Sequence, residues 1–314
     1  MSVRCAFLFP GQGSQAMGMG QDFFNNSQEA KDILHEASTH TGIDFTELLF
    51  QENMMLGETE YTQPAILLVG AMAHKLFVDA TGIKPVLTMG HSLGEFTALV
   101  AAGALDPVDA VKLVNLRGQL MAKACSKQEV GMMVSLGLSD EAVEKLCTEQ
   151  REAGLQVWAV NYNADGQIVI AGIKKDLELF APMVKEAGAK RAMLLDMSVA
   201  SHCPLLESAS APLEAKLKEV LKDEFIAPVI SNVTAKSYST KAEALALLPQ
   251  QLVKPVLYKH SMANIDDDVD CYIEFGHGTV LKGLNRKATK KPHFNVSDMA
   301  SLEATIASIK ELDV

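Results

Sequence analysis

Ser92 stands between two glycines, Gly90 and Gly94, with an apolar run before it and a helical run of small residues after it. On a sharp strand-to-helix turn, glycines at these two positions let the helix pass close to the strand, and the strained serine projects its hydroxyl from the sheet. The helix N-terminus then directs backbone N–H groups at the reacting centre. This spacing predicts a serine nucleophile; a serine that only caps the helix is the alternative.

A serine hydroxyl needs a base at neutral pH, usually a histidine. His202 follows a predicted strand, opens a loop before a helix and lies C-terminal to the serine, which is the order that hydrolase-like sheets use. We therefore favour His202 over His91, because adjacent side chains on such a turn point apart. Asp165 and Asp196 are candidate partners for the base, and the spacing favours neither. The other candidate bases are His260, His277 and His293.

Arg117 falls on the apolar stripe of a helical pattern, together with Leu113, Val114 and Met121. A guanidinium keeps its charge, so burying it costs several kcal/mol unless an anion meets it. A substrate carboxylate would meet it with two parallel hydrogen bonds. A structural ion pair with an Asp or Glu of the protein is the other interpretation, and the residues alone leave both open.

A parallel sheet covered by helices would position these residues, because short apolar runs alternate with helical patterns in the first third of the chain. We expect strands at 5–10 and 84–90, and helices at 63–80 and from Leu93 onward. His74 lies on the apolar helical pattern and is expected to be a core residue.

The middle of the chain has a different order of elements: strand, helix, strand, strand, helix, strand. This is the order of a ferredoxin-like split βαβ unit. The expected elements are a strand at 131–138, a helix at 140–154 capped by Ser139, strands at 156–163 and 167–172, a helix at 175–188 and a strand at 190–198. We therefore predict an α/β protein in which a small domain, 126–197, is inserted into a parallel-sheet domain formed by 1–125 and 198–314.

Composition excludes several functional classes. The net charge of −11 argues against a duplex nucleic-acid binder. The chain has no uninterrupted apolar run of roughly 18 residues, and its first residues read as a buried strand rather than a signal peptide. Five scattered cysteines fit a reduced, cytoplasmic protein. The basic run 284–293 is either a site for an acidic or phosphate-bearing partner or a solvated loop.

The serine, the histidine and the helical arginine together resemble one family, the free-standing malonyl-CoA–acyl carrier protein transacylases of bacterial fatty-acid synthesis. The resemblance covers nearly the whole chain, and its motifs occur in the family's order. The matching stretches are FPGQGSQ (9–15), GHSLGE (90–95), LRGQLM (116–121), NYNADGQIVIAG (161–172), SVASHC (198–203), QLVKPVLY (251–258) and EFGHGTVLKGL (274–284).

The resemblance implies an α/β-hydrolase-like core with a ferredoxin-like insert, and an S-malonyltransferase reaction that requires no metal and no redox cofactor. Ser92 would become acylated, His202 would act as its base, and Arg117 would hold the malonyl carboxylate. A main-chain carbonyl near Gln251 would orient the histidine, in place of an acidic side chain.

The resemblance also assigns the oxyanion hole to the backbone N–H groups of Gln12 and Leu93. Leu93 favours malonyl, because methylmalonyl relatives often have glutamine there. Two positions depart from related sequences. Ser201 stands where malonyl-selective polyketide acyltransferases usually carry phenylalanine, and His277 stands where relatives often have proline.

The partners implied are malonyl-CoA and an acyl carrier protein, with no role for nucleic acid or membrane. Carrier proteins are typically acidic, so docking on this acidic chain needs a local basic patch. The candidates are Lys282, Arg286, Lys287, Lys290 and Lys291. Two other functions stay open: a serine thioesterase or hydrolase of acyl-CoA, and a non-catalytic subunit that binds acyl carrier protein.

Overall fold

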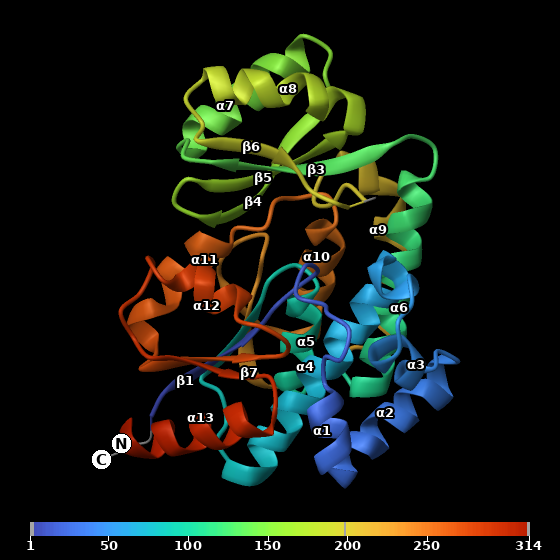
Figure 1. Cartoon of the computed structure of the whole chain (residues 1–314), viewed down its shortest axis with the longest axis vertical. Helices are drawn as coiled ribbons and strands as arrows, with labels where there is room; N and C mark the ends of the chain where they lie inside the picture. Colours follow the sequence, from blue (N-terminus) through green and yellow to red (C-terminus); the bar gives the residue numbers. More distant parts are fainter. Residues whose placement is uncertain (1–2, 198, 313–314) are drawn as a thin grey trace.

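The computed structural model describes residues 3–197 and 199–312, which form two β-sheets stacked along the long axis of the molecule (Figure 1). The larger sheet has the strand order β10-β9-β1-β2-β7-β8. Its neighbours run parallel, except that β7 and β8 run antiparallel. Its strands are β1 (Cys5–Phe9), β2 (Leu87–Gly90), β7 (Glu224–Ile230), β8 (Ser237–Thr240), β9 (Cys271–Phe275) and β10 (His293–Val296).

Helices cover both faces of this sheet. In β1 alternate side chains face opposite layers: Phe7 and Phe9 join the core on one face, and Ala6 and Leu8 join a smaller core on the other. The helices and short 3-10 turns of this part are α1 (Gln21–Asn26), α2 (Gln28–Thr41), α3 (Phe45–Phe50), η1 (Met55–Gly57), α4 (Thr59–Thr81), α5 (Gly94–Ala101), α6 (Pro107–Cys125), η2 (Pro204–Leu206), α9 (Glu207–Val220), α10 (Lys241–Gln251), α11 (Tyr258–Ile265), η3 (Asp266–Asp268), α12 (Val280–Asn285) and α13 (Met299–Leu312).

The helix α4 is the central helix of the larger core. Its composition is apolar enough, and its 23 residues are enough, to cross a membrane. Most of its length is nevertheless buried inside the fold, where it packs against α6 and α5. The run therefore reads as a buried core helix of this fold.

The smaller sheet is antiparallel, with the strand order β4-β5-β3-β6. Its elements are β3 (Val130–Leu136), α7 (Asp140–Glu152), β4 (Val157–Ala164), β5 (Gln167–Ile173), α8 (Lys174–Glu186) and β6 (Arg191–Leu194). The helices α7 and α8 cover one face, above the sheet in Figure 1. Ser139 caps α7 by accepting a hydrogen bond from the backbone N–H of Ala142, as predicted.

The elements predicted in the first two thirds of the chain are present, and the last predicted strand is shorter than expected. That strand was expected at 190–198, but β6 ends at Leu194 because its pairing with β3 ends there. The predicted end, Ser198, lies outside the described residues. The smaller sheet joins the larger part through a backbone bridge, in which Val256 donates to Val160 O at 2.8 Å and Tyr162 donates to Val256 O at 2.9 Å.

Candidate active site

Ser92 lies on a tight turn between β2 and α5, with a left-handed backbone at φ 52°. The flanking glycines are sterically required. A Cβ at Gly90 would lie 1.8 Å from the carbonyl carbon of Gly94, and a Cβ at Gly94 would lie 2.0 Å from Phe9 O. Side chains at these two positions would collide, as the sequence predicted, and the strained serine backbone is held by the closeness of strand and helix.

Asn232, just beyond the end of β7, ties the turn together. Its Oδ1 accepts from the backbone N–H of Ser92 at 2.6 Å, and its Nδ2 donates to Gly90 O at 2.7 Å. The sequence analysis did not identify Asn232 as a site residue, because none of the recognised motifs includes it or the strand before it.

The loop after β1 lies directly against this turn, since a Cβ at Gly11 would lie 2.3 Å from His91 O. Across the described residues, the backbone N–H groups of Gln12 and Leu93 donate to no protein acceptor. The side chain of Gln12 accepts from Thr59 Oγ1 at 2.9 Å, which fixes the loop to the start of α4. Two unused amides therefore lie close to the serine in the chain fold: one in its own turn and one in the loop packed against that turn.

His202 reaches the serine, with Nε2 2.7 Å from Ser92 Oγ. Its Nδ1 lies 2.6 Å from the main-chain oxygen of Gln251. A carbonyl oxygen only accepts, so Nδ1 carries the proton and Nε2 is free to accept from the serine hydroxyl. Burial, followed by the positive charge of Arg117, lowers the pKa of His202 to about 3, so the ring is neutral at neutral pH.

The carboxylates considered as partners for the base are placed elsewhere. Asp165 accepts from Lys259 Nζ at 3.1 Å on the surface. Within the described ranges His202 has no carboxylate partner, so neither Asp165 nor Asp196 orients it. The main-chain carbonyl of Gln251 does so, because the segment after α9 brings the end of α10 behind the ring. His202 is itself left-handed, at φ 61°.

Arg117 of α6 is 1% exposed and points at the serine. Its Nη1 donates to Gln63 Oε1 at 2.7 Å, and its Nη2 donates to Gln251 Oε1 at 3.0 Å and lies 3.4 Å from Ser92 Oγ. Its Nε has no partner, and no ion pair to it forms within residues 3–197 and 199–312. Burial lowers its pKa to about 10, which leaves it charged at neutral pH.

The histidines other than His202 lie away from the serine hydroxyl. His91 turns to the smaller sheet, where its Nε2 lies 2.7 Å from Asn163 Oδ1. His74 packs edge-on against Phe7, Phe9 and Phe275, but it is only partly buried, so it lies at the border of the core rather than inside it as predicted. The three other candidate bases also lie elsewhere: His260 by Tyr162, His293 by Tyr272, and His277 in the loop before α12. The remaining two histidines, His35 and His40, are on α2.

Glu95 is a buried carboxylate beside this centre that the sequence analysis did not single out. It is 1% exposed and accepts from Gln251 Nε2 at 2.6 Å, from the backbone N–H of Asn232 at 3.1 Å and from the Tyr238 hydroxyl at 3.0 Å. Burial raises its pKa to about 7, against these hydrogen bonds and the charge of Arg117. It lies in the first turn of α5, where an acidic residue ordinarily indicates only a favourable charge at a helix N-terminus.

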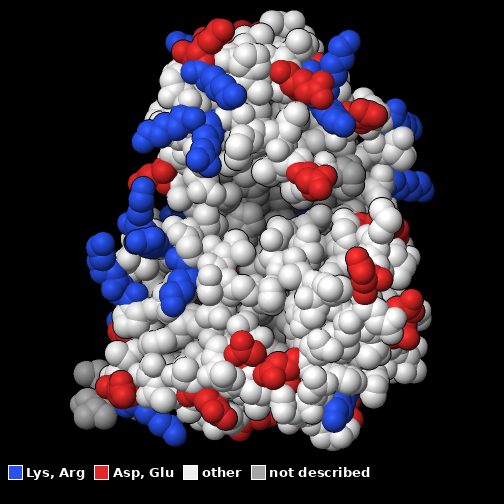
Figure 2. All heavy atoms as spheres, viewed as in Figure 1, with Lys and Arg blue, Asp and Glu red and all other residues white. Residues whose placement is uncertain are grey.

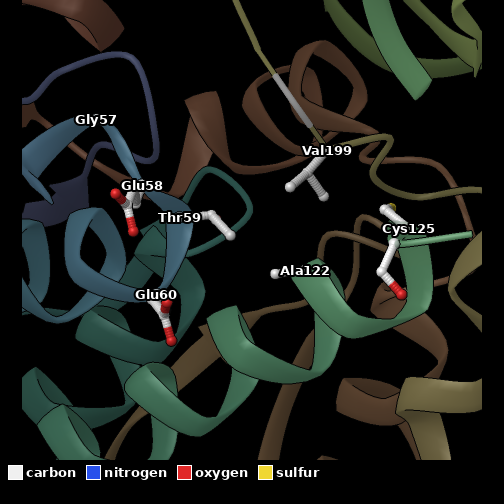
Figure 3. A pocket seen from close by; sticks show the side chains of 8 residues that line it. Gly57, Glu58, Thr59, Glu60, Ala122, Cys125 and Val199 are labelled. Atoms are coloured by element: carbon white, nitrogen blue, oxygen red, sulfur yellow. The ribbon is translucent and has the colours of Figure 1, made fainter. Parts of the chain in front are cut away.

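A pocket of about 310 Å³ adjoins the centre. Figure 3 shows Thr59 of α4 on one side of the pocket, Ala122 and Cys125 of α6 along another side, and Val199 opposite α6. Thr59 also bonds to Gln12 and Gln63, so this wall is continuous with the residues around Arg117. The molecular surface is hollowed between the two sheets in the same view as Figure 1 (Figure 2). A ligand can therefore approach from solvent.

Basic side chains gather on one side of the hollow, over α11 and α12 (Figure 2). Four of the predicted patch residues are exposed on or after α12: Lys282, Arg286, Lys287 and Lys290. Lys291 is partly buried, and its ammonium donates to Val269 O at 2.8 Å and to Asp266 O. Lys291 is thus held by backbone carbonyls and is less accessible than the others.

No group of three or more His, Cys, Asp or Glu side chains is placed to hold a metal ion in the part of the chain that the structure describes.

Known proteins resemble this chain along almost all of its length. The acyl transferase domain family model matches residues 6–309. A malonyl CoA-acyl carrier protein transacylase of Bacillus subtilis (strain 168) is 40% identical over 98% of both chains. The crystal structure of a malonyl-CoA:acyl carrier protein transacylase from Helicobacter pylori is 43% identical and superposes with a TM-score of 0.95, over 99% of both chains.

A further solved structure is a malonyl-transacylase in complex with its type II PKS acyl-carrier protein in the holo form. It is 36% identical, covers 97% of this chain and 99% of its own, and superposes with a TM-score of 0.93.

Proposed function

Since the chain belongs to the acyl transferase domain family, and within it to the malonyl CoA-acyl carrier protein transacylases, we propose that it moves a malonyl group from malonyl-CoA to the phosphopantetheine thiol of an acyl carrier protein. The observation that carries this proposal is the charged, buried Arg117 with its Nη2 3.4 Å from Ser92 Oγ. Such a cation requires an anion, and malonyl brings one at the end of the acyl group.

In the first step, His202 Nε2 takes the proton of Ser92 as Oγ attacks the thioester carbon. The unused amides of Gln12 and Leu93 are the donors for the oxyanion, each worth a few kcal/mol in such sites. The tetrahedral intermediate collapses, the carbon–sulfur bond breaks, and CoA leaves with the proton from His202. The malonyl group stays as an ester on Ser92, with its carboxylate at Arg117.

The acyl carboxylate also strengthens the base. The charge of Arg117 lowers the pKa of His202, after the larger effect of burial. A carboxylate paired with the guanidinium neutralises that charge, so the pKa of His202 rises when a malonyl group is bound. An acyl group without a carboxylate lacks this effect. Arg117 would therefore select malonyl in the chemical step as well as in binding.

In the second step, the carrier thiol gives its proton to His202 and attacks the malonyl ester, and Ser92 regains its proton as the ester bond breaks. Gln251 supports both steps through its main-chain oxygen, which fixes the His202 tautomer. Transfer rather than hydrolysis requires the thiol to reach the ester before water does, and the acyl group clamped at Arg117 restricts that approach.

We also propose an α/β-hydrolase-like core formed by 1–125 and 198–314, a ferredoxin-like inserted domain at 126–197 and a cytoplasmic location. The order β4-β5-β3-β6 with two helices on one face supports the ferredoxin-like comparison. The elbow between β2 and α5 supports the hydrolase-like one.

Intact-mass measurement after incubation with malonyl-CoA tests the function. We expect a malonyl adduct that Ser92→Ala abolishes, that Ser135→Ala keeps, and that holo acyl carrier protein removes. Ser135 is a matched control, because it is a buried serine of the smaller sheet. Free malonate without an adduct would support a thioesterase instead, and no change in malonyl-CoA would support a non-catalytic carrier-binding subunit.

We propose that the exposed basic residues on and after α12 dock the acyl carrier protein. Reversing Lys282 and Arg286 to Glu should raise the KM for the carrier several-fold, because both residues are exposed on or directly after α12. Loading of Ser92 from malonyl-CoA should stay unchanged. Transfer kinetics that do not change would remove this surface from the docking site. Reversal of Lys222, which is exposed just after α9 and outside the patch, is the control.

A further inference from the structure

We propose that Glu95 is a positioning residue, whose carboxylate fixes the Gln251 amide so that its oxygen holds Arg117 in place for the acyl carboxylate. This inference rests on the proposed function. The hydrogen-bond partners of Glu95 are Gln251, Asn232 and Tyr238, and it bonds to neither Ser92 Oγ nor the Arg117 guanidinium. It therefore acts through Gln251 and is not itself catalytic.

The Gln251 amide has two ends with opposite surroundings. Its Nε2 donates to Glu95 Oε2 at 2.6 Å and to Ser92 O at 3.1 Å. Glu95 Oε2 also accepts from the backbone N–H of Asn232 at 3.1 Å, so both atoms act as acceptors here. Its Oε1 accepts from Arg117 Nη2 at 3.0 Å, and a guanidinium can only donate. A flipped amide would place its NH₂ against the guanidinium and its oxygen against a carboxylate and a carbonyl. Both contacts would then be unfavourable, so Glu95 fixes the orientation together with Ser92 O and Arg117, and its contact, at 2.6 Å, is the shortest of the three.

Gln251 is the point at which the two halves of the site meet. Its side chain holds Arg117, while its main-chain oxygen accepts from His202 Nδ1. Arg117 Nη2 has a second neighbour, Ser92 Oγ at 3.4 Å, so a small displacement of the guanidinium moves it relative to the nucleophile. Losing the Gln251 oxygen would leave Nη2 with one long contact, and the guanidinium would then be held mainly through the bond from Nη1 to Gln63 Oε1.

Glu95 also reaches the turn that holds the nucleophile. The backbone N–H of Asn232 donates to Glu95 Oε2, and the Asn232 side chain clamps Ser92 N–H and Gly90 O. A purely structural role of Glu95 would therefore act on the turn and slow all acyl groups alike. The positioning role acts on Arg117 and changes malonyl loading relative to acetyl loading, which separates the two.

The test compares rates of Ser92 acylation by malonyl-CoA and acetyl-CoA, followed by intact mass, in Glu95→Leu and Glu95→Gln. We expect Glu95→Leu to lower the malonyl-to-acetyl ratio at least tenfold. Glu95→Gln should keep the ratio within about threefold of the native protein. Its amide oxygen can accept from Gln251, and its NH₂ can donate to the oxygen of Tyr238. Equal ratios in both variants, or equal loss of both acyl groups, would overturn the proposal.

A double-mutant cycle with Gln251→Met checks that Glu95 acts through Gln251. Gln251→Met alone should lower the ratio as Glu95→Leu does, and adding Glu95→Leu should change it no further. Tyr238→Phe is the matched control, because it removes a bond to the other oxygen of Glu95 and should leave the ratio unchanged.

Failure of the proposed role of Glu95 can be distinguished from failure of the proposed function. If Glu95→Leu does not fold, the Gln251→Met ratio decides: a native ratio there overturns the proposal, and a lowered one supports it. If the native protein forms no malonyl adduct, the proposed function itself fails. If it forms the adduct while every variant keeps the native ratio, only the role of Glu95 fails.

Discussion

The residues of the candidate active site come mainly from the part of the chain built around the larger sheet, and few come from the smaller sheet. In the larger sheet, parallel strands bring the segments after β2 and β7 to one edge, where Ser92 and Asn232 meet. The strands of both sheets carry few buried polar side chains: among the described residues these are Ser135 and Asn161 in the smaller sheet and Thr88 and Glu274 in the larger one. The difference lies in the segments after the strands, because neighbouring strands of the smaller sheet run antiparallel and end on opposite sides. The comparison shows that strand direction decides where reactive groups can gather, because only parallel neighbours end on the same side.

Strain follows the same division. The non-glycine residues with left-handed backbone in the described ranges include Ser92 and His202, the proposed nucleophile and base, and all of them belong to the larger part. Such conformations cost about 1–3 kcal/mol each and persist only where the surroundings enforce them. The smaller sheet, packed with α7 and α8, places its positive φ angles at glycines. The smaller sheet lies beside the site, where Asn163 contacts His91, and it supplies no non-glycine residue with a left-handed backbone among the described residues.

The variant with the largest expected effect, Arg117→Ala, tests whether the part of the chain around the larger sheet supplies the groups that select and activate the acyl group. Arg117→Ala should slow malonyl loading of Ser92 about 100-fold, since a buried charged hydrogen-bond pair is worth about 3 kcal/mol. Acetyl loading should rise, because the charge that lowers the pKa of His202 is gone. Rates of adduct formation with the two thioesters measure both changes. An equal loss for both acyl groups would mean that Arg117 is structural.

A smaller effect is expected from the smaller sheet. Asn163→Ala removes the 2.7 Å contact to His91 Nε2 and should slow malonyl and acetyl loading several-fold and equally. The reason is that His91 adjoins the nucleophile without touching Oγ. The same adduct assay measures it, with Asn161→Ala on the same strand as a comparison. A 100-fold loss would mean that the smaller sheet takes part in the chemistry.

The smallest effect on activity is expected from His74→Phe in the larger core. Burial lowers the pKa of His74 to about 4 from the usual 6.5, so its contribution to stability is present above pH 6.5 and is lost as pH falls toward 4. The variant should retain about 3 kcal/mol more stability than the native protein at pH 4, relative to pH 7.

Denaturant unfolding at the two pH values measures this difference, and loading rates at pH 7 should be unchanged. His40→Phe, at an exposed position of α2, is the control. Equal acid sensitivity of the native and His74→Phe proteins would contradict the lowered pKa of His74.

Local patterns in the sequence predicted the part of the site that depends on backbone geometry. Gly90 and Gly94 predict the elbow because their spacing records a steric contact between strand and helix. The apolar stripe of α6 predicted that Arg117 is buried. It could not tell which partners the guanidinium has, and Gln63 and Gln251 reach it from helices 54 and 134 residues away.

Contacts between distant segments were beyond such patterns. Asn232 follows β7 with no periodic signal, and Glu95 in a first helical turn reads as an ordinary charge near a helix N-terminus. The carboxylates Asp165 and Asp196 were considered as partners of the base, since acidic side chains usually fill that role. A backbone carbonyl leaves no mark on the sequence, and only the family resemblance pointed to it.

The position of β1 has a consequence for synthesis of the chain. Cys5 of β1 pairs with Cys271 of β9, 266 residues later, so the middle of the larger sheet cannot close until most of the chain has left the ribosome. The smaller sheet, whose strands lie within residues 130–194, can fold long before that. A nascent chain would thus carry a finished small unit while β1, which can already pair with β2, still lacks its second neighbour β9.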